Sequence, residues 1–219
     1  MDQIFTTALM GSLPRSSRLL EAKEQKTVGS LSAQGYQDIL FNETRRMVAI
    51  QEEAGIDVIT SGELDRDNYI SYVAAKVDGI EIMTNDELLD YSSEEFRKSY
   101  EKSLKERDAK DAGINNPIAV GKIDTQAQLN FEEIHMLEAL TDKPLKATLP
   151  SPYLLTRSLW LTGVSDQVYA NREALGKDIR ELILNEVKRL IDRGVRVIQL
   201  DDPVLSQIVF TDEEDQTFY

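Results

Sequence analysis

One structural unit occurs at least twice in the sequence, and this repetition constrains the fold more than any other feature. In each copy an amphipathic helix pattern ends at a glycine, a short strand rich in β-branched residues follows, and a carboxylate closes the unit. Gly55 ends the first helix, and the segment IDVITSGE leads to Glu63. Gly194 ends the second helix, and VRVIQLDD leads to Asp201 and Asp202. Strands that alternate with helices predict parallel pairing with right-handed crossovers.

The two helices of the repeated unit are predicted from apolar residues at helical spacing. Each is followed by glycine, the residue that adopts the left-handed conformation after a helix C-terminus at no steric cost. The predicted apolar faces consist of Tyr36, Ile39, Leu40, Met47 and Ile50 in the first helix, and of Ile179, Leu182, Ile183, Val187, Leu190 and Ile191 in the second.

Three further strands are predicted, over Ile4–Leu9, Ile118–Ile123 and Leu145–Leu149, which brings the number of strands to about five. A closed (β/α)8 barrel needs eight strands and typically about 250 residues. From the residues alone, the α/β sheet is therefore either open or part of an incomplete barrel. The charged segment 78–116 is predicted to be a helical insertion with a solvated face.

The composition excludes several classes of function. A formal net charge of -14 repels nucleic acid and anionic lipid, so neither is an expected partner. No apolar run approaches the roughly 20 residues of a membrane span, and the first residues lack the pattern of a secretory signal, so a cytoplasmic protein is expected. Cysteine is absent and His135, on a helical pattern, is the one histidine, so these residues cannot assemble a zinc site or a histidine-based triad.

Functional residues of parallel α/β folds gather where the strands end. The stretches MGSLPR, SGELDR, LPSP and LDDP occupy such places, and they contain Ser12, Glu63 and Asp201. A single carboxylate there is equally suited to capping the next helix. Two carboxylates on separate strands can instead hold a substrate ammonium or carry out acid/base chemistry. Their spacing in the sequence does not show which of these two roles they have.

As an ordered set, MGSLPR, SGELDRDNY and QLDDP resemble the motifs of the cobalamin-independent methionine synthase family, specifically its C-terminal catalytic barrel, from about Thr6 to Pro203. The resemblance implies a (β/α)8 barrel that transfers a methyl group to the sulfur of homocysteine, with zinc holding the sulfur as a thiolate. With about five of eight units, the chain would be a single barrel domain over residues 1–219 that is truncated at its C-terminus.

The resemblance also implies roles for individual residues. Ser12 matches a serine near the substrate carboxylate, and Glu63 and Asp201 match acids that hold the homocysteine amino group. Asp202 and Pro203 would turn the chain away from the strand. The zinc ligands of the family, a histidine, two cysteines and a glutamate, would lie beyond residue 219.

The sequence departs from the family pattern at several motif positions. Ser61 stands where histidine precedes the GE pair, and LDDP has aspartate where the family has glutamate. Ala112, Gly113 and Ser158 stand where the family holds its folate donor with arginine, cysteine and tryptophan, and Trp160 is two positions away. The methyl donor, methyltetrahydrofolate or a corrinoid, is therefore left open.

Two other functions are consistent with the residues. The same zinc chemistry can alkylate another thiol such as coenzyme M, and a non-catalytic α/β domain can bind a small amino acid through Glu63 and Asp201. A barrel that lacks three strands would also leave an apolar sheet edge, which predicts self-association.

Overall fold

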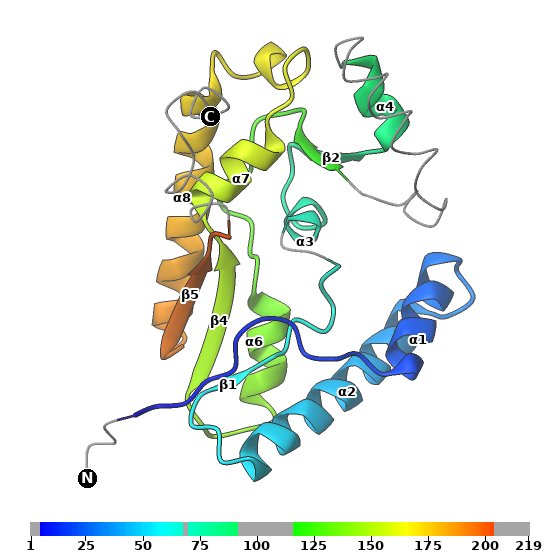
Figure 1. Cartoon of the computed structure of the whole chain (residues 1–219), viewed down its shortest axis with the longest axis vertical. Helices are drawn as coiled ribbons and strands as arrows, with labels where there is room; N and C mark the ends of the chain where they lie inside the picture. The colour runs from blue at the N-terminus through cyan, green and yellow to red at the C-terminus, as the bar shows by residue number, and fades with distance from the viewer. Residues whose placement is uncertain (1–4, 68–69, 92–115, 204–219) are drawn as a thin grey trace. The chain divides into compact units, whose positions relative to one another are not determined.

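A three-stranded sheet joins segments that are far apart in the sequence (Figure 1). The computed structural model describes residues 5–67, 70–91 and 116–203. The sheet has the order β1, β4, β5, and its strands are β1 (Ile59–Thr60), β4 (Leu145–Pro150) and β5 (Val197–Asp201).

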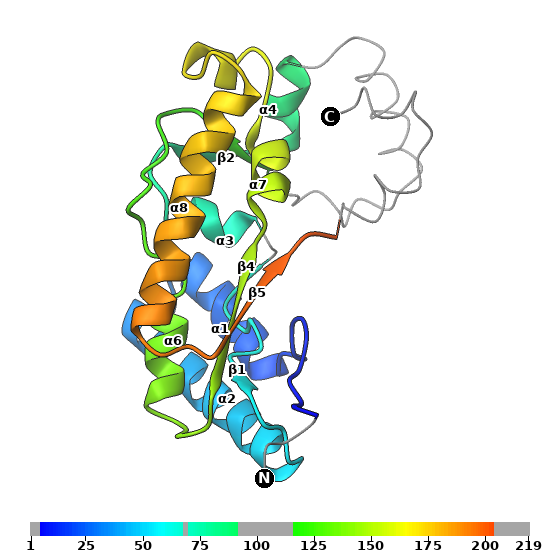
Figure 2. The same cartoon turned by 90° about the vertical axis from the view of Figure 1, so that its left-hand side faces the viewer.

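The strands of this sheet are parallel. β1 pairs in parallel with β4. Between β4 and β5, Arg196 N donates to Leu145 O at 3.0 Å and Ser151 N donates to Asp201 O at 2.9 Å. Because these two bonds advance in the same direction along both strands, β4 and β5 are parallel as well, and they lie side by side in both views (Figure 2).

The described residues also form helices and a second pair of strands. The helices are α1 (Ser17–Thr27), α2 (Ala33–Glu53), α3 (Ser71–Ala74), α4 (Asn85–Asp90), α6 (Phe131–Glu138), α7 (Pro152–Leu159), the 3-10 helix η2 (Ser165–Gln167) and α8 (Arg172–Asp192). The second pair of strands is β2 (Ile80–Met83) and β3 (Asn116–Ala119). None of the helices in these ranges is long and apolar enough to span a membrane.

Both copies of the repeated unit form as predicted, with α2 before β1 and α8 before β5. Gly55 and Gly194 have φ of 75° and 82°. In each copy the residue after the glycine donates its N–H to the carbonyl five residues earlier, at 2.9 and 3.0 Å, which closes the same C-terminal cap. Most of each predicted apolar face is buried, but the last position is not: Ile50 is 47% exposed and Ile191 is 59% exposed.

The chain divides into two compact units. The first comprises Met1–Arg66, Asn130–Leu149 and Val187–Gln199. The second comprises Asp67–Leu129, Pro150–Glu186 and Leu200–Tyr219.

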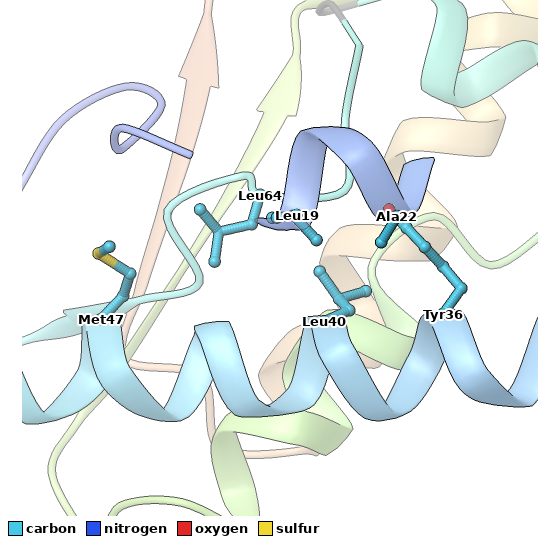
Figure 3. Packing of buried hydrophobic residues seen from close by; sticks show 6 residues of the cluster. All are labelled: Leu19, Ala22, Tyr36, Leu40, Met47 and Leu64. Atoms are coloured by element: carbon cyan, nitrogen blue, oxygen red, sulfur yellow. The ribbon is translucent and has the colours of Figure 1, made fainter. Parts of the chain in front are cut away.

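Apolar residues of α1, α2 and the loop after β1 form a core cluster in the first unit (Figure 3). The two helices begin at serine N-caps: Ser16 accepts a hydrogen bond from Leu19 N, and Ser32 accepts one from Gly35 N. The cluster consists of Leu19, Ala22, Tyr36, Leu40, Met47 and Leu64.

The predicted first strand, Ile4–Leu9, is present in its described part only as a single bridge, next to β1. Ala8 forms an isolated parallel bridge with Val58, and Val58 N donates to Thr7 O at 3.1 Å. Ile4 lies outside the described residues.

The prediction that Ile118–Ile123 joins the parallel sheet is wrong. β3 pairs antiparallel with β2, with Ile80 opposite Ala119. Gly79 permits this pairing because its φ is 90° and a Cβ at this position would come 2.3 Å from the Lys122 carbonyl oxygen. The backbone of Gly121 can therefore approach closely, and its N–H donates to Gly79 O at 3.0 Å.

The segment 78–116 contains more than the predicted helical insertion in its described part. It supplies β2, and then α4, which begins with a capping box between Thr84 and Glu87. The rest of the insertion, residues 92–115, lies outside the described residues.

Candidate functional site

Glu63 follows β1 in an unusual backbone conformation. Its φ of 55° is the only positive value among the described residues other than glycine. The left-handed region costs a residue with a Cβ roughly 1–2 kcal/mol, and such residues are concentrated at functional sites. Gly62 before it has φ 71°, and a Cβ there would come 2.7 Å from the side chain of Leu13. The turn therefore depends on glycine at position 62.

The Glu63 carboxylate is held by two hydroxyl groups. Ser12 Oγ donates to Oε2 at 2.7 Å, and Thr148 Oγ1 from β4 donates to Oε1 at 2.9 Å. Glu63 is 3% exposed and Thr148 is 4% exposed. A carboxylate has about four acceptor positions. The two hydroxyls leave acceptor capacity for a ligand that donates hydrogen bonds.

Arg66 connects this carboxylate to a second one. Its Nε and Nη2 donate to the two oxygens of Glu133 on α6 at 2.7 and 2.8 Å, a two-pronged pair. Its Nη1 donates to Thr148 Oγ1 at 3.0 Å and lies 3.8 Å from Glu63 Oε1. Ser61 Oγ also donates to Glu133, at 2.9 Å. Ion pairs and hydrogen bonds therefore join two buried carboxylates to one guanidinium.

The charge distribution in this cluster is uneven. Arg66 makes its short contacts with Glu133, whereas Glu63 receives hydroxyl donors and a distant guanidinium. Two buried carboxylates that share one guanidinium leave an excess of negative charge, and an ammonium ligand would offset it. The arrangement around Glu63 is therefore suited to a cationic group.

Arg15, in the MGSLPR stretch, holds the turn that carries Glu63. Its Nε donates to Leu64 O at 2.9 Å and its Nη2 donates to Glu63 O at 3.0 Å and to Arg66 O. The guanidinium thus binds backbone carbonyls rather than the carboxylate. Its function here is to fix the backbone of the turn.

The end of β5 belongs to the second unit and is held differently. Asp201 is half-buried, and its carbonyl accepts a hydrogen bond from Ser151 N at 2.9 Å. Ser151 Oγ donates to Asp202 Oδ2 and accepts from Leu154 N at 3.0 Å, as the N-cap of α7. Asp202 Oδ1 is buried and receives no hydrogen bond from the described residues. Asp202 thus stabilises the N-terminus of α7 through its hydrogen bond with the N-cap residue Ser151.

The structure brings two of the three predicted site residues into contact. Ser12 and Glu63, 51 residues apart, are joined by a hydrogen bond. The role of Ser12, Glu63 and Asp201 in binding a substrate stays a prediction. Sequence reasoning missed Arg66 and Glu133. The one signal for Glu133 is its position four residues before Leu137, which places a carboxylate on the buried face of α6.

The described residues do not fit a zinc site. No group of three histidine, cysteine, aspartate or glutamate side chains within them is arranged to hold a metal ion. The sequence has no cysteine, and the side chain of His135 is 72% exposed on α6. His135 is therefore a surface residue.

The structure describes the surroundings of Ser61, Ser158 and Trp160, which lie at or beside the motif departures. The hydroxyl of Ser61 donates to Glu133 and accepts from Glu63 N at 3.2 Å. Ser158 is half-buried in α7, and Trp160 Nε1 donates to Thr162 Oγ1 at 3.3 Å. Positions 112 and 113 lie outside the described residues.

Comparison with known sequences gives one consistent result. A family model described as "Cobalamin-independent synthase, Catalytic domain" matches residues 5–219. The chain is 26% identical over 205 residues to the 5-methyltetrahydropteroyltriglutamate--homocysteine methyltransferase of Thermotoga petrophila, and 28% identical over 203 residues to that of Xylella fastidiosa. These alignments cover 93% of this chain but 25% and 24% of the relatives, so the chain spans about a quarter of their length.

Solved structures show the same fold. A protein of Listeria monocytogenes assigned to the vitamin-B12 independent methionine synthases matches with a TM-score of 0.68 at 22% identity, over 95% of this chain and 55% of that chain. A B12-independent methionine synthase of a Shewanella species, in complex with selenomethionine, matches with a TM-score of 0.59 at 22% identity, over 85% of this chain and 47% of that chain.

Proposed function

The chain belongs to the family described as cobalamin-independent synthase, catalytic domain, and on this premise we propose that it forms the amino-acid-holding part of an S-methyltransferase. The reaction is transfer of a methyl group to the thiol of homocysteine, which gives methionine. Two curated relatives carry the name of a homocysteine methyltransferase, and this supports the reaction class.

The observation that carries the proposal is the environment of Glu63. Its carboxylate is buried, lies in a left-handed turn and is oriented by Ser12 and Thr148, and it shares its cation, Arg66, with Glu133. Homocysteine carries an ammonium group that supplies the missing positive charge and several N–H donors. Glu63 therefore binds the amino group of the substrate.

Asp201 is the second acid in this proposal. It ends the strand of the second copy of the repeated unit, as Glu63 follows the strand of the first. Ser12 has two functions: its hydroxyl orients Glu63, and its position in the MGSLPR stretch suits it to the substrate carboxylate.

We extend the proposal to the fold of the whole domain. The parallel order of β1, β4 and β5 and the two solved relatives support a (β/α)8 barrel to which this chain contributes about five units. A cytoplasmic location and self-association of the isolated chain remain predictions.

The proposed reaction also requires a metal and a methyl donor. Zinc would hold the homocysteine sulfur as a thiolate, and the residues that the structure describes do not form its ligand set. The printed names of the relatives point to a methyltetrahydropteroyl donor, and a corrinoid is the alternative.

The same charge argument favours an amino acid over coenzyme M. Coenzyme M carries a sulfonate and no amino group, so a buried carboxylate repels it rather than binding it. An acidic site of this kind therefore selects a thiol that carries an ammonium.

Calorimetric titration of the chain tests the proposal. L-homocysteine and L-methionine are expected to bind, whereas 2-mercaptoethanesulfonate and 3-mercaptopropanoate, which lack the amino group, are not. Glu63→Gln and Asp201→Asn should each weaken methionine binding about tenfold or more, because each loses a charged hydrogen bond to the ammonium. Glu181→Gln, at an exposed position of α8, is the matched control and should bind normally.

Equal affinity for thiols with and without the amino group would refute the proposal. Amino-acid binding combined with no methyl transfer by the protein that carries the zinc ligands would favour a non-catalytic binding domain instead.

A further inference from the structure

The second unit contains a cavity that shares no residue with the amino-acid site. It has a volume of about 420 Å3, which is within the usual range for small-molecule sites. Tyr153, Thr156 and Arg157 of α7 line it together with Arg172, Gly176 and Arg180 of α8.

In the cavity wall, glycine interrupts a row of long side chains on α8. Arg172, Gly176 and Arg180 are four residues apart and share one face of α8. A Cβ at Gly176 would lie 3.4 Å from Thr156 Cγ2 and Oγ1, so even alanine would touch the opposite wall. Glycine is a poor helix former, and its position inside a 21-residue helix lets Thr156 approach the backbone of α8 between two arginines.

The lining is cationic, although the chain as a whole has a formal charge of -14. It includes Lys177 and Glu173, which neutralise one another in an exposed ion pair at 3.0 Å. It also includes the guanidinium groups of Arg157, Arg172 and Arg180. In the part of the chain that the structure describes, no ion pair joins Arg172 or Arg180 to a carboxylate.

We propose that this cavity binds a small molecule with two or more negative charges. The planar guanidinium groups of Arg172 and Arg180 match phosphate and carboxylate oxygens in two-pronged geometry. The ring of Tyr153 supplies an apolar wall for the body of the ligand. The first turn of α8, which includes Arg172, adds the positive potential of a helix N-terminus.

Titration calorimetry of the chain at low ionic strength tests this site with two probes, tripolyphosphate and citrate. At least one is expected to bind saturably with one-to-one stoichiometry, and sodium chloride at equal ionic strength is not. Tighter binding of tripolyphosphate identifies a phosphate ligand, and tighter binding of citrate identifies a polycarboxylate.

Three variants locate the binding. The double variant Arg172→Gln/Arg180→Gln should weaken it by about a hundredfold, since each charged contact contributes about tenfold. Gly176→Leu should abolish it, because the added side chain would occupy space between Thr156 and α8 that lines the cavity, although helix propensity improves. Lys188→Gln, an exposed cation on α8 outside the cavity, should change it less than about twofold.

The absence of saturable binding by both probes at millimolar concentration would overturn the proposal. An equal loss in Lys188→Gln and in the double variant would also overturn it, because the attraction would then be non-specific. Circular dichroism checks that each variant is folded, and the two single arginine variants decide the question if Gly176→Leu does not fold.

Discussion

The ends of β1 and β5 arise from the same sequence unit but hold their carboxylates differently. After β1, Glu63 is buried in a left-handed turn and receives hydrogen bonds from Ser12 and Thr148. At β5, Asp201 is half-buried, and the described bonds fix its backbone carbonyl and the neighbouring Asp202. The helix, glycine and strand thus determine where a carboxylate stands, and its surroundings determine how firmly it is held.

The difference comes from residues outside the repeated unit. Glu63 depends on Gly62 in its turn, on a hydroxyl from β4 and on the Arg66–Glu133 pair. The β5 end depends on Ser151, which links the strand to the start of α7. Changes at each end should therefore have different consequences.

The largest expected effect follows from removing Arg66. Arg66→Ala leaves Glu63 and Glu133 buried without their shared cation, which should lower the free energy of unfolding by about 3–5 kcal/mol. Urea denaturation measures this change.

The matched control is Arg46→Ala, which removes an exposed ion pair with Glu43 at 3.5 Å. Its effect should stay below about 1 kcal/mol. If the two variants are destabilised equally, Arg66 does not organise the β1 end.

Replacing the glycine at either helix cap should lower stability by the same amount. Gly55→Ala and Gly194→Ala each force a Cβ into the left-handed region, which costs roughly 1–2 kcal/mol. Neither new Cβ would meet another atom within 4 Å, so the cost is backbone strain alone. Thermal unfolding of both variants should give equal losses, and a clear difference would show that the two copies are not equivalent in their scaffold.

Replacing Ser12 or Ser151 should have the smallest effects on stability and should distinguish the β1 end from the β5 end. Ser151→Ala removes a buried N-cap and the hydroxyl that binds Asp202, so it should lower stability by about 1 kcal/mol. Ser12 is exposed, and water can replace its hydroxyl at Glu63, so Ser12→Ala should cost about 0.5 kcal/mol. Instead, Ser12→Ala should weaken methionine binding. If urea denaturation shows a larger loss of stability for Ser12→Ala than for Ser151→Ala, this view of the β1 end is contradicted.

Much of the scaffold was predictable because local patterns determine it. Helical spacing and a terminal glycine predicted α2 and α8, and β-branched runs predicted β1, β4 and β5. β2 was missed because its four residues lie in a charged segment, and the partner of β3 was wrong because strand pairing depends on contacts that a local pattern does not contain.

The candidate site was only partly predictable for the same reason. Glu63 and Ser12 follow strand signals, and they meet as parallel strands require. Arg66, Glu133 and Thr148 lie up to 85 residues from the groups they bind. Their side chains look like ordinary helix and strand residues until the fold brings them together.

The most direct test of the account is a crystal structure of the chain with L-methionine bound. The account predicts the amino nitrogen within about 3.2 Å of carboxylate oxygens of both Glu63 and Asp201. An amino nitrogen that contacts neither carboxylate, or Glu63 alone, would contradict the claim that the two strand ends hold one amino acid.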